Sequence, residues 1–362
     1  MQIRPAYTCD STLKTNDPPS SLRSMGWDER WNALLKEVDT AEGSPPVPGR
    51  VIRRDRGVVL VGTEGSVVPA ETAGHPEQVI TGDWVALSGD RLLAVLPRRG
   101  ALRRRGADDS EQLMAANVDV VLLVCGLDRP VKPGRIHRGA VQAWDAGAEP
   151  VVVLNKADLC EDPLARAEDV AGQTLGLDVL TVSARTGRGL DELRAAIGGR
   201  TAVLLGESGA GKSSLLNALA GRSLTPEGEV RAGDSKGRHT TTRRELYFLP
   251  GSGVVIDTPG IRSLGLVASA EAVETAFGDV ETIAEDCRFS DCLHETEPDC
   301  AIQAAIDAGT LRPDRVQAYL ELRKELQGQV LRANPHERRQ HERKFARLVQ
   351  EGKKAKQGRL KK

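Results

Sequence analysis

The sequence predicts an α/β protein in which a domain of alternating strands and helices follows a small β-barrel and precedes a mostly helical region. Three observations support this fold class. A complete G-x-x-x-x-G-K-S motif at Gly206–Ser213 lies between an apolar run and a segment of helical composition. Five short apolar runs separated by glycines come before it, and three cysteines and a histidine cluster after it. A chain of 362 residues is long enough for two or three domains.

The leader, residues 1–44, is rich in Pro, Ser and Asp and contains one candidate helix around Trp27 and Trp31, followed by Leu34, Leu35 and Val38. Its first residues contain no apolar core segment, and no apolar run in the chain is long enough to span a membrane. We therefore expect a cytosolic protein that does not bind membranes. As a separate expectation, the protein is a monomer.

Residues 45–105 read as a barrel, because five short strand-like runs with glycine turns follow one another within about fifty residues. This pattern suits an OB-fold, although other small β domains would look similar. Five arginines lie between Arg98 and Arg105. Arginine at this density can bind RNA phosphates, and a solvated linker without a ligand is an equally good interpretation.

Residues 106–270 alternate between apolar runs and helical segments, which indicates a parallel sheet. The run 118–124 is nearly continuous, the run 150–154 leads into Asn155-Lys156-Ala157-Asp158, and the run 178–182 leads into Ser183-Ala184-Arg185. Each run thus delivers polar residues to a strand's carboxyl end, where open α/β sheets bind their ligands.

The sequence Asn-Lys-x-Asp can select guanine, because a fixed carboxylate at Asp158 accepts hydrogen bonds from the N1–H and the 2-amino group of that base. Adenine offers neither donor in those positions. We expect Lys156 to lie along the base plane and Asn155 to tie this loop to the phosphate loop. In the second base-reading loop, which starts at Ser183, we expect the Ala184 N–H to bond the guanine O6. Asp158 as a simple helix N-cap is the alternative.

The phosphate loop supplies backbone N–H groups that surround a polyphosphate, and the helix that follows points its positive end at the same anion. Lys212 is expected to reach the β and γ phosphates, and the Ser213 hydroxyl to hold Mg²⁺. The nucleotide-binding residues of this loop are Gly206, Glu207, Ser208, Gly209, Ala210, Gly211, Lys212, Ser213 and Ser214.

The segment 228–244 is polar and contains Thr241, whose hydroxyl is a candidate to complete the Mg²⁺ shell when a γ-phosphate is bound. An ordinary surface loop is the alternative. A further apolar run, 253–256, ends in Asp257-Thr258-Pro259-Gly260. We expect Asp257 to support Mg²⁺ through water and the Gly260 N–H to bond the γ-phosphate.

These five elements together form a GTPase motif set in an unusual order, since the base-reading loops precede the phosphate loop instead of following it. A circular permutation preserves the sheet and its site while it moves the termini. With this order the sequence closely resembles the RsgA (YjeQ) family of circularly permuted GTPases over roughly residues 45–330. The resemblance implies GTP hydrolysis to GDP, stimulated by the small (30S) ribosomal subunit, and a role in late maturation of its 16S rRNA.

Many GTPases orient the attacking water with a Gln directly after Asp-x-x-Gly, but this chain has Ile261 there. Another group must then position the water, and His239 beside the switch threonines is the nearest titratable candidate. The alternative is that His239 is solvated or contacts RNA.

Residues 271–333 contain Cys287, Cys292, His294 and Cys300 with the spacing C-x4-C-x-H-x5-C. Three thiolates and one imidazole form a closed tetrahedral set, which is typical of a structural zinc site. Clustered cysteines in a reducing compartment indicate metal binding rather than disulfides.

The tail, residues 334–362, carries eleven Lys/Arg and three Glu, so its formal charge is +8 in a chain whose net charge is -1. Such a segment is suited to salt-sensitive contact with rRNA, and a solvated tail that only promotes solubility is the alternative.

Two functions are compatible with these features. One is a GTPase whose nucleotide state controls its binding to ribosomal RNA, and the other is an RNA-binding module that uses GTP as a structural ligand with negligible turnover. Only the first predicts a rate of phosphate release that small subunits raise.

Overall fold

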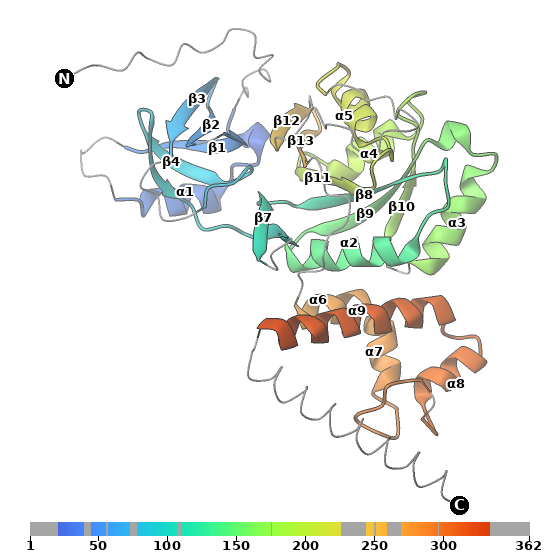
Figure 1. Cartoon of the computed structure of the whole chain (residues 1–362). Coiled ribbons are helices and arrows are strands. Elements are labelled where there is room, and N and C mark those ends of the chain that lie inside the picture. Colours follow the sequence, from blue (N-terminus) through green and yellow to red (C-terminus); the bar gives the residue numbers. More distant parts are fainter. Residues whose placement is uncertain are drawn as a thin grey trace, which may run out of the picture.

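The computed structural model describes residues 21–39, 45–55, 57–72, 78–106, 110–174, 176–225, 244–249, 251–258, 269–295 and 297–333. They form a β-barrel, a central α/β domain and a helical module, arranged as Figure 1 shows. The strands are β1 (Val47–Arg54), β2 (Val58–Thr63), β3 (Ser66–Glu71), β4 (Trp84–Ser88), β5 (Arg91–Val95), β6 (Ala101–Arg105), β7 (Glu111–Ala116), β8 (Val120–Gly126), β9 (Glu149–Asn155), β10 (Asp178–Thr181), β11 (Thr201–Gly206), β12 (Glu245–Leu249) and β13 (Gly253–Asp257). The helices are η1 (Arg23–Met25), α1 (Glu29–Lys36), α2 (Pro133–Asp145), η2 (Ala157–Leu159), α3 (Pro163–Gln173), α4 (Leu190–Ile197), α5 (Lys212–Ala220), α6 (Ala270–Ala276), α7 (Gly278–Ala284), α8 (Ala301–Asp307) and α9 (Pro313–Ala333).

The first five strands close into a barrel, which confirms the predicted β domain. The order around the barrel is β1-β2-β3-β5-β4, and β4 pairs again with β1. All of these pairings are antiparallel except β3 with β5, as in an OB-fold. Alternate valines and leucines fill the interior, because successive side chains of a strand point to opposite faces.

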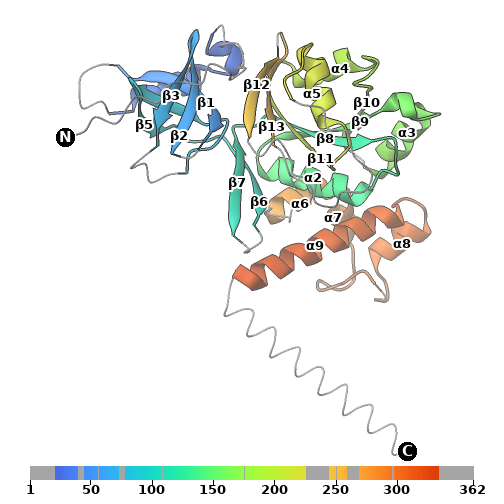
Figure 2. The same cartoon turned by 45° about the horizontal axis from the view of Figure 1, so that its top comes forward.

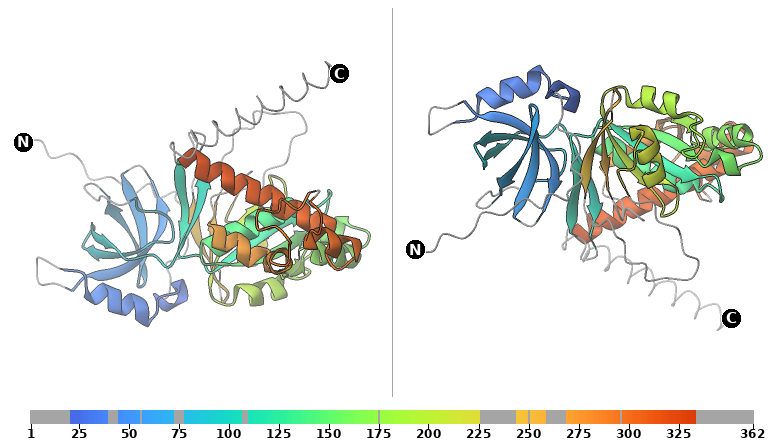
Figure 3. Two further views of the ribbon diagram at one scale, coloured as in Figure 1. Left: turned by 90° about the horizontal axis from the view of Figure 1, so that it is seen from below. Right: turned by 90° about the horizontal axis from the view of Figure 1, so that it is seen from above.

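The leader helix α1 packs on the outside of the barrel (Figure 3). Asp28 begins this helix by accepting hydrogen bonds from the backbone N–H groups of Arg30 and Trp31. Trp27 and Trp31 then contact Trp84 of β4, with ring centroids 4.9 and 5.9 Å apart. The described part of the leader therefore packs on the barrel surface through this tryptophan cluster.

Arg50 of β1 is a fully buried cation where the leader, the barrel and the α/β domain meet. Its guanidinium donates to the carbonyl oxygens of Met25, Gly82 and Asn117, and it lies over the ring of Trp84. Burial lowers the pKa of Arg50 to about 10, so the side chain stays charged at neutral pH. Three carbonyl dipoles compensate a charge that would otherwise be costly to bury.

The central sheet has the order β10-β9-β8-β11-β13-β12. Its first five strands are parallel, and β12 is antiparallel at the end next to the barrel, where Arg53 of β1 pairs with Glu245. Helices α2 and α3 cover one face and α4 and α5 the other (Figure 1). Burial on both faces explains why these strands are nearly continuous apolar runs.

The Arg-rich stretch is not an open linker, since Ala101–Arg105 forms strand β6 of a hairpin with β7. Figure 2 shows this hairpin between the barrel and the α/β domain. The expected barrel boundary at residue 105 thus falls inside the hairpin. Arg98 binds the buried carboxylate of Asp83 through two hydrogen bonds of 2.6 and 2.8 Å, whereas the Arg103 side chain is about half exposed.

The helical module, α6 to α9, packs beneath α2 (Figure 1). Its core contains Phe277, Tyr319 and Leu322 together with Val141 of α2. Arg138 of α2 also pairs with Glu325 of α9 at 2.8 Å. In the described part of the chain, no helix combines the length and apolarity that crossing a membrane requires.

Candidate functional site

The sequence motifs of the α/β domain meet at one edge of the central sheet. Parallel strands end at the same edge, so the residues after β9, β10, β11 and β13 share one location. The predicted base-reading loops follow β9 and β10, and the phosphate loop follows β11. Asp257 ends β13, which is paired directly with β11.

The phosphate loop is shaped by two glycines. A Cβ at Gly206 would come within 2.2 Å of the Val124 carbonyl oxygen. At Gly211 the backbone has a φ of +88°, and a Cβ would come within 2.4 Å of Asn155 Nδ2. Side chains are therefore excluded where the loop turns and where it contacts the base-reading loop.

Lys212 begins α5 and folds back over the loop. Its ammonium donates to the Gly206 and Glu207 carbonyl oxygens at 2.7 and 2.8 Å. Ser213 and Ser214 follow in the first turn of the helix and are half-buried. The Glu207 side chain pairs with Arg135 of α2, a contact that the sequence analysis did not predict.

Asn155 joins the base-reading and phosphate loops, as expected. Its buried amide donates to the Ala210 and Gly211 carbonyl oxygens at 3.0 and 3.4 Å. Its side-chain oxygen accepts a hydrogen bond of 3.2 Å from the Ala184 N–H, the group expected to bond guanine O6. The three segments thus form one connected unit.

Asp158 lies at the end of the same loop and is held by two donors. The Ser183 hydroxyl donates to Oδ1 and the Arg185 guanidinium pairs with Oδ2, both at 2.5 Å. The hydrogen bond from Ser183 is the main reason that the pKa of Asp158 is below its usual value, and Arg185 adds to the effect. The side chain is an anionic acceptor at neutral pH, which is the form that guanine recognition needs.

Asp257 is buried beside the phosphate loop. Burial raises the pKa of its carboxyl group, and the positive charge of Lys212 opposes this effect. The next residue, Thr258, is also buried, and its hydroxyl donates to the Leu204 carbonyl oxygen at 3.4 Å. A carboxylate at the end of β13 and the Ser213 hydroxyl are hard oxygen donors, which suit Mg²⁺.

Four predicted residues, His239, Thr241, Gly260 and Ile261, lie outside the described residues. Asp128 contacts Lys156 at 2.9 Å and was not predicted from the sequence. Asp128 belongs to no motif, but it follows the buried strand β8 as the base-reading residues follow β9. Its position directly after a buried parallel strand is the feature from which Asp128 could have been predicted.

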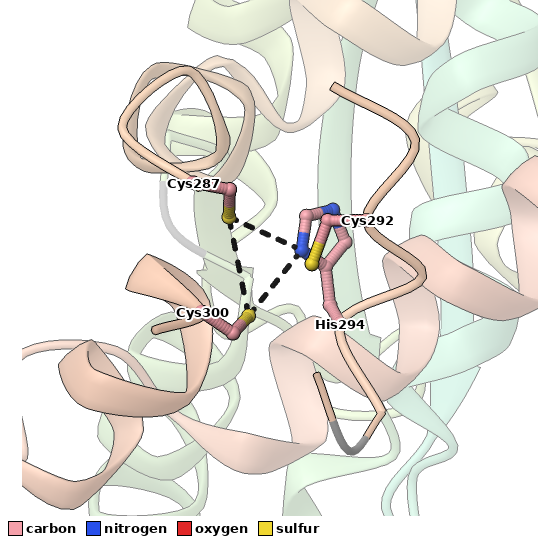
Figure 4. Close-up of side chains that lie close together, drawn as sticks. All are labelled: Cys287, Cys292, His294 and Cys300. Carbon is pink, nitrogen blue, oxygen red and sulfur yellow. Dashed lines mark hydrogen bonds between the residues drawn. The ribbon is translucent and has the colours of Figure 1, made fainter. Parts of the chain in front are cut away.

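The cysteine–histidine cluster comes together in the helical module (Figure 4). The Sγ atom of Cys287 lies 3.9 Å from Cys300 Sγ and 3.5 Å from His294 Nδ1, and the ligand atoms of all four residues, Cys292 included, lie within 4.8 Å of one another. A tetrahedron with Zn–S bonds of about 2.3 Å has edges of about 3.8 Å. The four side chains fit one structural zinc ion, and none of the four positions is left for a substrate.

Comparisons with known proteins agree with this architecture. The family model described as RsgA GTPase matches residues 95–267. A Streptomyces coelicolor protein named "Small ribosomal subunit biogenesis GTPase RsgA" is 44% identical over 350 residues, which cover 93% of this chain and 95% of that protein.

Two solved structures share the fold. The crystal structure of YjeQ from Thermotoga maritima has a TM-score of 0.59 and 28% identity, covering 78% of this chain and 99% of that one. The structure of YloQ, described as a circularly permuted GTPase, has a TM-score of 0.56 and 24% identity, covering 80% of this chain and 98% of that one. The second likeness concerns the fold alone, and the expected permuted order of strands and loops agrees with it.

Proposed function

The chain belongs to the RsgA GTPase family, and from this membership we propose that it hydrolyses GTP to GDP and phosphate during late maturation of the small ribosomal subunit. The observation that carries this proposal is the match of 44% identity over 93% of the chain, which includes the barrel, the GTPase domain and the zinc module. The geometry supports it, because Asn155 connects both base-reading loops to the phosphate loop.

In this proposal guanine binds against Asp158 and the phosphates bind in the loop 206–214. The nucleotide displaces two groups from their present partners. Guanine replaces Arg185 as the partner of Asp158 Oδ2. The β and γ phosphates replace the carbonyl oxygens that now accept hydrogen bonds from Lys212. Both exchanges replace one strong polar contact with another, so the site is already close to its bound shape.

Mg²⁺ would be held by Ser213 and, through water, by Asp257, with Thr241 completing the shell when GTP is bound. The ion neutralises phosphate charge in the transition state of hydrolysis. The γ-phosphate would also accept a hydrogen bond from the Gly260 N–H. His239 is proposed to orient the attacking water, since Ile261 has no group that can do so. His239→Ala should then lower the stimulated rate at unchanged GTP affinity.

The partner is the small subunit with its 16S rRNA. The basic tail and the exposed Arg103 of the β6–β7 hairpin supply cationic contacts to phosphates, and such binding weakens steeply with salt. We also propose that the protein is a monomer of the cytoplasm, where it meets its ribosomal partner, and that zinc has a purely structural role.

The decisive experiment measures phosphate release with and without purified small ribosomal subunits. The proposal predicts slow intrinsic turnover and a large increase with subunits, and Lys212→Ala should abolish both. An RNA-binding module that holds GTP as a structural ligand would show no increase, and that result would reject the proposed enzyme role.

Nucleotide choice has its own test in Asp158→Asn. The amide would offer a donor where the carboxylate accepts, so preference should move from GTP toward the xanthosine nucleotide. Unchanged preference would show that Asp158 does not contact the base.

A further inference from the structure

The loop after β8, residues 126–130, belongs to none of the recognised nucleotide motifs, yet it contacts both the base-reading and the phosphate loop. The Leu127 N–H donates to the Asn155 carbonyl oxygen at 2.8 Å. Arg129 Nη1 lies 3.5 Å from the Ser208 carbonyl oxygen. The loop therefore lies behind the two segments that are proposed to grip the nucleotide.

Asp128 is the centre of these contacts. Its Oδ2 atom accepts hydrogen bonds from Lys156 Nζ and Arg129 Nη2, each at 2.9 Å. Lys156 Nζ also donates to the Gly209 carbonyl oxygen at 2.5 Å. One carboxylate thus links the lysine of the base-reading motif, a neighbouring arginine and, through them, two consecutive carbonyl groups of the phosphate loop.

From this geometry we infer that Asp128 is a positioning residue for the nucleotide, which acts by fixing the ammonium of Lys156 against the phosphate loop. The inference rests on the proposed function, because it assigns to Asp128 the pre-organisation of the GTP site. With its end fixed at Gly209, the alkyl chain of Lys156 is held where the base plane is expected to lie. Asp128 itself does not contact the nucleotide.

Two features show that the local backbone is built for this contact. A Cβ at Gly126 would come within 2.4 Å of Asp128 Oδ1, so a side chain at that position would push the carboxylate away. Lys156 has a φ of +65°, a left-handed conformation that is unfavourable for a lysine and persists only when its surroundings fix it. In the described part of the chain, Asp128 is the one carboxylate that pairs with Lys156.

The charge of Asp128 is secure at every pH at which the enzyme would work. The hydrogen bond from Arg129, followed by the contact with Lys156, lowers the pKa of Asp128 to about 2. A flexible lysine loses much rotational freedom when a ligand fixes it. Because Asp128 restricts Lys156 before the nucleotide arrives, binding loses less entropy.

The test replaces Asp128 with the isosteric, uncharged asparagine. Asp128→Asn should raise the Kd for GDP and for GTP by the same factor, roughly tenfold. The ratio of GTP to xanthosine nucleotide affinity should stay unchanged, because Asp158 is intact. At saturating GTP the kcat with small subunits should stay within about twofold, since the effect is on binding.

A matched control is Asp169→Asn, which removes a half-exposed carboxylate paired with Arg166 on α3, a helix that contributes no residue to the predicted nucleotide site. Its nucleotide affinity should equal that of the unmodified protein. A double-mutant cycle with Lys156→Met then asks whether Asp128 acts through the lysine. The double variant should bind GDP no more weakly than Lys156→Met alone.

Three results would overturn the inference. In the first, Asp128→Asn leaves the Kd for GDP unchanged within twofold. In the second, the effects of Asp128→Asn and Lys156→Met on that Kd are additive. In the third, nucleotide-free Asp128→Asn has a lower thermal midpoint, and this loss of stability accounts for the weaker binding. Failure of the proposed function looks different, because the unmodified protein would then bind no guanine nucleotide or show no stimulation by small subunits.

Discussion

The ion pair between Arg98 and Asp83 supports a specific prediction about the Arg-rich stretch. Arg98→Ala would leave the Asp83 carboxylate, whose side chain is 0% exposed, without its cationic partner. The Ile80 N–H would still donate a hydrogen bond to that carboxylate, at 2.8 Å. Arg98 also donates to the Gln78 carbonyl oxygen at 2.7 Å, a contact that the variant loses as well.

The expected loss of stability is large. Removing one partner of a buried pair typically costs about 3–5 kcal/mol, because the remaining buried charge loses the ion pair that compensated it. With a urea dependence of about 2 kcal/mol per M, the unfolding midpoint of the barrel should fall by roughly 2 M. Arg103→Ala is the matched control, since its ion pair with Glu111 is half-exposed on both sides and such pairs contribute less than about 1 kcal/mol.

Tryptophan fluorescence is a suitable assay, because Trp27, Trp31 and Trp84 lie in one cluster on the barrel and the chain has four tryptophans. Arg98→Lys keeps the charge but loses the forked geometry, so its midpoint should be intermediate. If Arg98→Ala unfolds at the same urea concentration as Arg103→Ala, the Arg98–Asp83 pair does not stabilise the barrel and the reasoning is wrong.

Two further predictions concern the helical module and helix α2, which packs against it. Cys300→Ser, or removal of zinc by a chelator, should reduce the bound zinc from one equivalent toward none. The helical circular dichroism signal should fall as well, because the free energy of zinc binding stabilises the folded state at such sites. Full helicity without zinc would contradict this prediction. Burial, together with the charge of Arg315, lowers the pKa of His137 to about 4, although Asp279 and Asp314 oppose the shift and His137 Nε2 bonds the Gln173 carbonyl oxygen. A histidine in the unfolded chain titrates near pH 6.5. Between about pH 6.5 and 4 the unfolded chain therefore binds a proton that the folded chain excludes. The free energy of unfolding should fall by up to roughly 3 kcal/mol as the pH drops through this range. His137→Gln should flatten that part of the urea-midpoint profile, and an equally steep profile would show that His137 is not responsible.

The parts of the site that depend on local sequence could be predicted. Asn155, Asp158 and Lys212 belong to short motifs at strand ends, and the four zinc ligands lie within fourteen residues, so spacing alone was enough to predict both groups. The barrel followed from alternating runs and glycine turns, and the helix at Glu29–Lys36 from its apolar spacing.

The contacts that could not be predicted join residues distant in sequence. Asp128 reaches Lys156 across 28 positions, and Arg50 binds the Asn117 carbonyl oxygen across 67. Charged side chains in such places look like ordinary surface residues in the sequence, because nothing local indicates that the fold buries or pairs them. The same reason explains why Arg98 could not be distinguished from Arg103 within one basic stretch.

Helix α2 contributes side chains to two hydrophobic cores. Its Ile136 and Ala140 face the central sheet, whereas Val141 belongs to the core of the zinc module and Trp144 packs against both. A shortened protein that stopped before Ala270 would expose this second face to water and would lose the partner of Arg138. The helical module therefore completes the burial of a helix of the GTPase domain, and the same helix carries Arg135, which pairs with Glu207 of the predicted phosphate loop.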